Sequence, residues 1–209
     1  MAQQHQSTEI RRRQIINAAR QLIIKHGSEN VTIRGISGEV GISEAAIYRH
    51  FRNKRDILLL LADDIGETLI NDIALSINRK DSVLDKLNRV SLRQISAIAQ
   101  RRGVSFLVIA EIISFGDREL NARMGAGLSR YIGRLQTLFE EGVINNELRK
   151  DLDPQAAALL MFGMIQGIVN LWALNNFGFD LKRRYNPVWA NFRQGILNPD
   201  SARTPAGVT

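Results

Sequence analysis

The chain has 209 residues, of which 44% are hydrophobic and 23% are charged, a balance typical of a soluble globular protein with a sizeable core. It contains no cysteine, which excludes disulfides, cysteine metal ligands and thiol nucleophiles. The net charge is +7, and residues 1–60 hold 10 Lys and Arg against 5 Asp and Glu, so we expect this part of the chain to face a polyanion.

A first helix is predicted over residues 9–26, because apolar side chains recur there at helical spacing. Residues 1–8 are polar, and we expect them to be disordered. Arg11, Arg12 and Arg13 lie near the helix start, where positive charge opposes the helix dipole. A phosphate from outside would remove that conflict, and a solvated arginine cluster is the alternative.

Residues 31–58 predict two short helices, a tight turn and the start of a third helix. Thr32 is a good N-cap, and the apolar residues after it recur at helical spacing. Gly41 can take a left-handed conformation and so allow a sharp corner. Ser43 caps the second helix and Asn53 caps the third. This arrangement is typical of a helix-turn-helix, whose second helix enters the major groove of DNA.

We predict that DNA is contacted by side chains in and around the second helix. Tyr48, His50 and Lys54 can donate hydrogen bonds to phosphate oxygens and so fix the position of the protein on the duplex. Glu44, Ala45 and Arg49 could read cytosine, the thymine methyl group and guanine, although Arg49 could equally lie along the backbone. The full set of predicted DNA contacts is Thr32, Arg34, Ser43, Glu44, Ala45, Tyr48, Arg49, His50 and Lys54. The alternative is a small helical core with a solvated charged face.

The same stretch resembles the DNA-binding region of the TetR family of bacterial transcriptional regulators. The residues that match the family pattern are Thr32, Ile36, Gly41, Ser43, Tyr48, His50, Phe51, Lys54 and Ile57. The chain departs from the pattern at Ser37, Val40 and Ile42, which are modest changes of size in a packed corner. The rest of the chain is similar to the family only in length and helical layout. The resemblance implies an all-α homodimeric repressor that binds an inverted-repeat operator and responds to a ligand.

The remainder of the chain is predicted to be helical, with no convincing strand alternation or internal repeat. Apolar periodicity and proline positions predict helices over residues 54–78, 81–101, 104–115, 117–145, 154–176 and 187–197. The predicted domains are a helix-turn-helix DNA-binding domain over 1–52, a helical effector-binding and dimerisation domain over 53–198, and a flexible tail over 199–209.

The last two predicted helices are the candidate dimer interface. The first of them contains Gly163 and Gly167 one turn apart, which is weak support for close helix contact outside a membrane. The resemblance implies that the pair forms a four-helix bundle with a second copy of the chain. The alternative is that both helices complete the core of a monomer.

The middle helices offer side chains for a cavity that binds a small apolar or amphipathic effector. Methionine is soft and suits an adaptable apolar cavity. The candidate lining residues are Phe106, Ile109, Ile113, Met124, Leu128, Tyr131, Met161, Gln166 and Asn170, with Glu111 and Arg123 as further polar contacts. The same residues would suit an ordinary core equally well.

Motifs typical of enzymes are absent from the sequence. It has no phosphate loop, no G-x-S-x-G elbow, no histidine pair at metal spacing and no histidine after His50 to act as the base of a triad. We therefore expect no enzymatic activity, no cofactor and no metal. Two alternatives stay open: a DNA-binding protein of this fold without a small-molecule effector, and a helical enzyme or partner-binding protein that retains the motif as a relic.

The start of the chain is polar, without the apolar segment of a signal peptide. We expect no apolar run to reach the roughly 20 residues that span a bilayer, the longest being Val104–Phe115. These observations predict a cytoplasmic protein without membrane contact.

Overall fold

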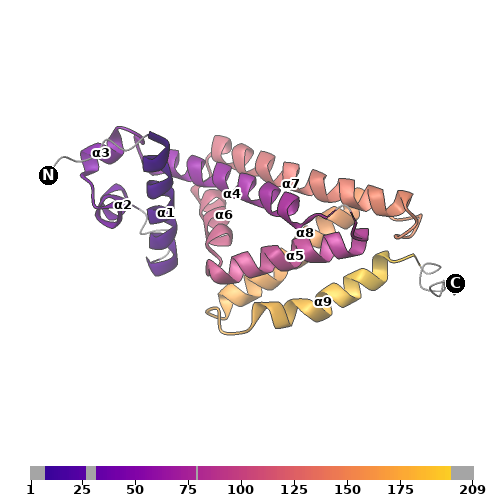
Figure 1. Cartoon of the computed structure of the whole chain (residues 1–209). Coiled ribbons are helices and arrows are strands. Elements are labelled where there is room, and N and C mark those ends of the chain that lie inside the picture. The colour runs from indigo at the N-terminus through magenta and orange to yellow at the C-terminus, as the bar shows by residue number, and fades with distance from the viewer. Residues whose placement is uncertain (1–7, 27–31, 79, 199–209) are drawn as a thin grey trace. The chain divides into compact units, whose positions relative to one another are not determined.

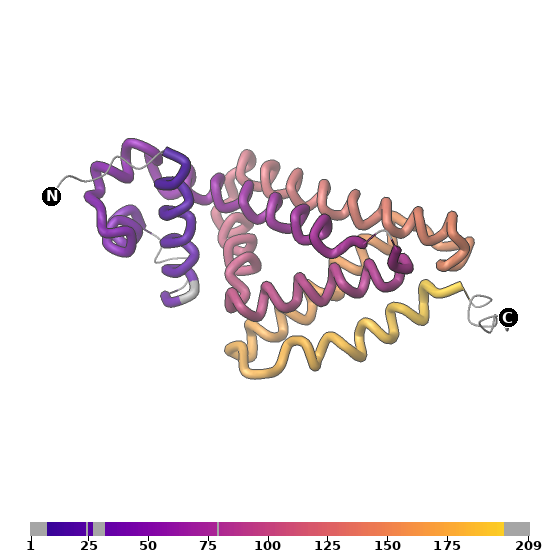
Figure 2. Tube along the Cα trace, viewed as in Figure 1, coloured from indigo at the N-terminus to yellow at the C-terminus, as the bar shows by residue number. Residues whose placement is uncertain are grey.

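The computed structural model describes residues 8–26, 32–78 and 80–198, which fold into α-helices joined by turns and short loops (Figures 1 and 2). In chain order these helices are α1 (Thr8–His26), α2 (Ile33–Val40), α3 (Glu44–Tyr48), α4 (Lys54–Ser76), α5 (Val83–Gln100), α6 (Val104–Phe115), α7 (Arg118–Ile144), α8 (Pro154–Leu174) and α9 (Leu181–Ile196). No extended strand occurs in the described ranges, where Leu148 and Leu197 form an isolated antiparallel bridge. The prediction of an all-α chain is confirmed.

The last helix begins earlier than predicted. The side chain of Asp180 accepts a hydrogen bond from the backbone N–H of Arg183 at 3.0 Å, so α9 starts at Leu181 and Pro187 lies inside it. Leu181 and Tyr185 are buried, and their packing favours the added turns. The expectation that Pro187 would begin the helix was therefore wrong, because burial outweighs the backbone hydrogen bond that an internal proline removes.

The two ends of the chain were predicted to be disordered. Thr8 is the first residue of α1, so this expectation was wrong for that position. Residues 1–7 and 199–209 lie outside the described residues.

Helix α8 is long and apolar enough to cross a membrane by length and composition. The expectation that no stretch reaches this length was therefore wrong, although a core helix of a soluble protein can pass the same test. One side of α8 is buried and includes Met161, Ile165 and Trp172. The opposite side is exposed over an arc of roughly 120°, taking 100° per residue. This α8 face consists of Ala156, Leu159, Leu160, Gly163, Gly167, Asn170, Leu171 and Leu174.

The described residues form two compact units. The first contains those up to Ile65 together with Arg101–Gly127, and the second contains Gly66–Gln100 and those from Leu128 onward. In the first unit α1 packs against α2 and α6, and α2 packs against α3. In the second unit α9 packs against α5 and α8. Helices α4 and α7 contribute residues to both units, and the predicted domain division at residue 52 stays a prediction.

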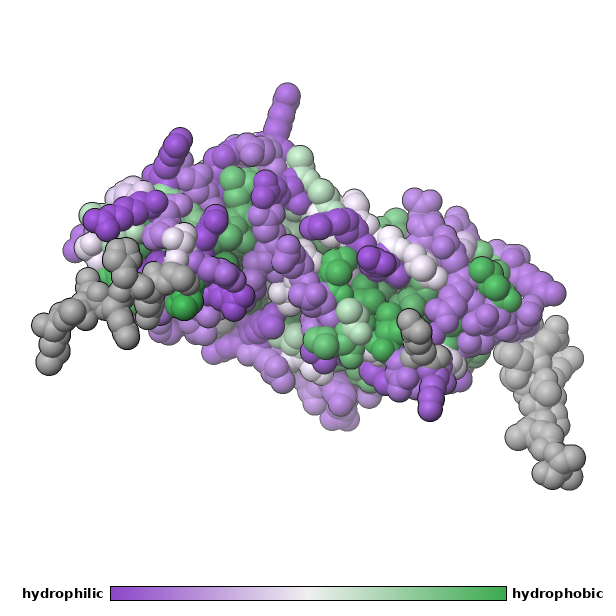
Figure 3. Space-filling model, turned by 45° about the horizontal axis from the view of Figure 1, so that its top comes forward, coloured by the Kyte–Doolittle hydropathy of each residue, from purple (hydrophilic) through white to green (hydrophobic). Residues whose placement is uncertain are grey.

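Each unit has its own apolar core. Fully buried side chains of the first unit include Ile15, Ile36, Ile47, Leu58 and Leu61. Those of the second unit include Leu87, Tyr131, Leu135, Phe139, Met161 and Tyr185. On the face shown in Figure 3, hydrophilic residues cover most of the surface and hydrophobic residues gather in a patch on the right half of the view.

Candidate nucleic-acid interface

The corner between α2 and α3 has the geometry of a helix-turn-helix. The Thr32 hydroxyl accepts a hydrogen bond from the backbone N–H of Gly35 at 3.0 Å and so caps α2. Gly41 ends that helix in the left-handed region, with φ of 72°. The backbone N–H of Ile42 then donates to the Ser37 carbonyl at 3.0 Å. A side chain at position 41 would strain this turn, so glycine is required for the conformation rather than for space.

Helix α3 is held by a cap at its start and by burial of one side. The Ser43 hydroxyl accepts from the backbone N–H of Ala46 at 3.2 Å. Ile47 is fully buried, and Phe51 directly after the helix is 2% exposed. The rest of this short helix therefore faces outward, as a recognition helix must.

Most of the predicted DNA contacts are exposed around α3. The exposed ones are Thr32, Arg34, Ser43, Glu44, Ala45, Tyr48 and Arg49, and Tyr48 has an exposed fraction of 52%. The hydroxyls of Thr32 and Ser43 use an oxygen lone pair for capping, which leaves each hydroxyl proton able to donate to a phosphate. Apart from Glu44 and Ala45, these exposed side chains can all donate hydrogen bonds, and the role of each residue in DNA binding stays a prediction.

His50 and Lys54 differ from the others because both are only partly exposed. His50 borders a hollow of about 230 Å³ with Arg12, Phe51, Asp56, Leu59, Leu60, Asp63 and Arg123. The Arg12 guanidinium lies 6.0 Å from the centre of the Phe51 ring, a contact that the sequence did not indicate. Lys54 donates from Nζ to Oε1 of Glu111, on α6, at 2.7 Å.

The three N-terminal arginines have different contacts. Arg11 donates to the Gln14 side chain at 2.9 Å, and Arg13 pairs with Glu9 across one turn of α1 at 2.9 Å. The pair with Glu9 neutralises part of the charge at the helix start, whereas the Gln14 amide is neutral and leaves the charge of Arg11 in place. The proposed phosphate contact of this cluster stays a prediction.

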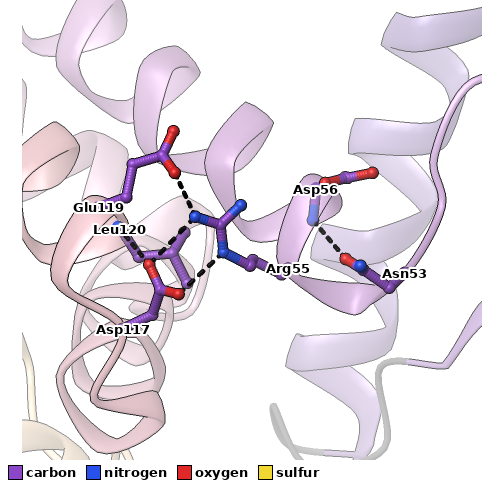
Figure 4. A network of polar contacts seen from close by, with 6 residues as sticks. All are labelled: Asn53, Arg55, Asp56, Asp117, Glu119 and Leu120. Carbon is purple, nitrogen blue, oxygen red and sulfur yellow. Dashed lines mark hydrogen bonds and ion pairs between the residues drawn. The ribbon is translucent and has the colours of Figure 1, made fainter.

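Ion pairs also join α4 to the start of α7 (Figure 4). Arg55 donates from Nε to Oδ2 of Asp117 at 2.9 Å and from Nη2 to Glu119. The hydrogen bonds that Arg55 donates to Asp117 and then to Glu119 raise the pKa of Arg55. The hydrogen bond from Arg55 and then that from the Leu120 backbone N–H lower the pKa of Asp117. The start of α4 is capped as well, since the backbone N–H of Asp56 donates to Asn53 Oδ1 at 3.1 Å.

Two further ion pairs hold the first unit together. Arg123 forms a bidentate pair with Asp63, at 2.7 Å for each hydrogen bond, and the pair raises the pKa of Arg123. Arg20 of α1 pairs with Asp64 of α4. Sequence reasoning missed the pairs of α4 with α1, α6 and α7, because the partners are 44 to 64 positions apart and no local spacing signals them.

The predicted effector contacts are divided between the two units. Phe106, Ile109, Ile113 and Met124 belong to the first unit, and Leu128, Tyr131, Met161, Gln166 and Asn170 belong to the second. Ile113 and Asn170 are exposed, whereas Met124, Tyr131 and Met161 are buried. The Tyr131 hydroxyl donates to Gln94 Oε1 at 2.6 Å, and burial raises the pKa of this tyrosine. The effector-binding role of all nine residues stays a prediction.

Comparisons with known proteins decide the family. Residues 15–61 match the model of bacterial regulatory proteins of the tetR family, and residues 63–195 match that of the YsiA-like protein, C-terminal region. The chain belongs to the TetR family. The resemblance seen in residues 31–58 is confirmed, and this TetR-family chain is a DNA-binding transcriptional regulator.

Two curated proteins are similar to this chain over most of its length. The fatty acid metabolism regulator protein of Bacillus subtilis (strain 168) is 28% identical over 185 residues, which cover 88% of this chain and 95% of that protein. The nucleoid occlusion factor SlmA of Vibrio cholerae serotype O1 is 27% identical over 185 residues, covering 86% of this chain and 92% of that protein. One relative of this TetR-family chain is thus named as a regulator of metabolism and the other as a nucleoid occlusion factor.

Solved structures of the family share the fold. The transcriptional regulator FadR from Bacillus subtilis in complex with stearoyl-CoA has a TM-score of 0.77 and 27% identity, covering 88% of this chain and 98% of that one. The fatty acid degradation regulator FadR from Bacillus halodurans has a TM-score of 0.77 and 24% identity, covering 90% and 96%. Among the described residues of the present chain, no group of three or more His, Asp or Glu side chains is arranged to hold a metal ion.

Proposed function

We propose that this TetR-family regulator is a cytoplasmic repressor that binds an inverted-repeat operator as a homodimer and releases it when a fatty acyl thioester binds. The observation that carries the DNA-binding part is the capped, outward-facing helix α3, with exposed Glu44, Ala45 and Arg49 available to base edges. A dimer would place two copies of α3 in successive major grooves, about 34–36 Å apart.

The α8 face supports the homodimer. It presents leucines, glycines and an alanine to solvent, with Asn170 as its polar member and no charged residue. Leu160, Leu171 and Leu174 have exposed fractions of 64%, 59% and 79%. A continuous apolar surface of this kind favours association, and its small residues would allow close approach of a second helix.

The acyl thioester is proposed from the Bacillus relatives. One is a fatty acid metabolism regulator, and one was solved with stearoyl-CoA. Such a ligand combines an apolar chain with a polar head, which agrees with the apolar and amide character of the candidate residues Met161 and Gln166.

A second candidate function is DNA binding without a small-molecule effector. It is favoured by the 27% identity to SlmA, which is named as a nucleoid occlusion factor rather than a metabolic regulator. This candidate predicts that DNA affinity is insensitive to acyl thioesters.

A gel-shift titration tests the proposal. The probe is the DNA that flanks the gene of this protein, and stearoyl-CoA, free CoA and stearate are added separately. We expect a specific shift that stearoyl-CoA reverses and that free CoA leaves in place. Operators selected with Arg49→Ala and Glu44→Ala should differ from the wild-type operator at the positions that these side chains read. A shift that none of the three compounds changes would favour DNA binding without a small-molecule effector. The absence of any specific shift would overturn the proposal that the protein is a repressor.

A further inference from the structure

We propose that Glu111 competes with DNA for Lys54, so that a carboxylate on α6 lowers the affinity of the protein for every DNA sequence. The proposal rests on the DNA-binding function proposed above and on the predicted phosphate contact of Lys54. It adds a competing residue that is 57 positions away from Lys54 in the chain.

Lys54 is less exposed than Tyr48 and Arg49, two other predicted DNA contacts. Its side chain is 28% exposed, and the Glu111 side chain that holds it is 17% exposed. Tyr48 and Arg49 are exposed at the end of the same recognition element. The ammonium group therefore already has a partly desolvated anionic partner, 2.7 Å away, when the protein is free of DNA.

The fold keeps Lys54 within reach of Glu111. Lys54 is the first residue of α4, and Asn53 directly before it caps that helix. The next residue, Arg55, is bound by Asp117 and Glu119, as Figure 4 shows. Neighbours on both sides of Lys54 are therefore tied down, and the ion pair with Glu111 does not depend on a flexible segment.

Counterion release gives the expected size of the effect. Each lysine that neutralises a phosphate contributes about −0.9 to the slope of log K against log salt. A lysine already neutralised by a carboxylate makes a smaller contribution, so removing the Glu111 charge should steepen the slope by up to about one. An ion pair of this exposure is worth about 1 kcal/mol, which corresponds to roughly a fivefold gain in DNA affinity when the competitor is removed.

The experiment compares two neutralised glutamates in the full-length protein. Glu111→Gln removes the carboxylate that pairs with Lys54, and Glu119→Gln makes the same change of net charge while removing a partner of Arg55. Affinity is measured at several salt concentrations on the flanking-DNA probe and on a duplex of arbitrary sequence, because a phosphate contact acts on both. Thermal unfolding of each variant reports whether it is folded.

We expect Glu111→Gln to bind both duplexes several-fold more tightly with a steeper salt slope, and Glu119→Gln to change neither by as much. The gain should disappear in the Lys54→Met background. If Glu111→Gln fails to fold, Glu111→Ala also removes the carboxylate and should raise affinity in the same way. Equal gains in the two glutamine variants, no gain, or a gain that survives Lys54→Met would each overturn the competition. The gel shift of the wild-type protein with its flanking DNA does not depend on these variants. Failure of the competition would therefore leave the proposed DNA-binding function standing, and failure of the gel shift would be seen separately.

Discussion

Replacing Gly142 by alanine should destabilise the second unit, although alanine is the better helix former. Gly142 lies in the last turn of α7. A Cβ atom there would lie 2.6 Å from Cδ1 and 2.7 Å from Cγ of Leu148, and 3.0 Å from Cγ1 of Val83. Leu148 and Val83 are both fully buried. Gly133 on the same helix is the matched control, because a Cβ atom there would have no neighbour within 4 Å.

The two substitutions differ in packing rather than in helix propensity. Alanine gains about 1 kcal/mol over glycine inside a helix, so Gly133→Ala should be stabilising by up to that amount. At Gly142 the same gain is opposed by overpacking, which costs about 1–3 kcal/mol. The backbone of Leu148 is held close to position 142, because its N–H donates to the Gly142 carbonyl at 3.0 Å and the residue forms the isolated bridge with Leu197. Leu148 therefore cannot move away from an added Cβ atom without losing these contacts. The difference in the free energy of unfolding between the variants should therefore be about 1–3 kcal/mol.

Thermal unfolding of the two variants tests this difference. For a chain of this size, 1 kcal/mol moves the midpoint by about 2–4 °C. Gly133→Ala should unfold at or slightly above the wild-type temperature, and Gly142→Ala several degrees below Gly133→Ala. Equal midpoints for the two variants would refute the steric reasoning, since both would then report helix propensity alone.

Two further predictions concern the second unit. Leu171→Asp places a charge on the α8 face and should weaken dimerisation at least tenfold, measured by sedimentation at several concentrations. The matched control Leu75→Asp changes an exposed leucine of α4, outside the candidate interface, and should leave dimerisation unchanged. An unchanged dimer in Leu171→Asp would remove the α8 face from the interface. Tyr131→Phe should lower the free energy of unfolding by about 1–2 kcal/mol at pH 7, because the buried Gln94 oxygen loses its donor. Burial raises the pKa of Tyr131, so the unfolded chain ionises this tyrosine first and the stability of the wild type falls as the pH rises above 10. Urea titrations from pH 7 to 11 should show a shallower fall for Tyr131→Phe, and parallel curves would contradict the assigned cause.

Local signals in the sequence determined the helix-turn-helix. Thr32, Gly41 and Ser43 act through hydrogen bonds and backbone angles that involve residues no more than five positions away. Such interactions depend on residue type and spacing, which a single sequence displays directly. The same holds for Asp153, whose side chain accepts from the backbone N–H groups that open α8. The fold class and the family could be predicted for this reason.

Tertiary structure alone decided which residues lie together. Lys54 of α4 pairs with Glu111 of α6, and these two helices meet only because of the way α1, α4 and α6 pack. Helical periodicity shows which side of each helix is apolar, but it does not show which helices lie next to each other. The start of α9 shows the same limit. Asn186, directly before Pro187 where the helix was predicted to begin, and Asp180 are both acceptable caps by residue type. Burial of Leu181 and Tyr185 against the second unit made Asp180 the cap. Residue types therefore allowed either cap for α9, and the free energy of packing determined which one the helix uses.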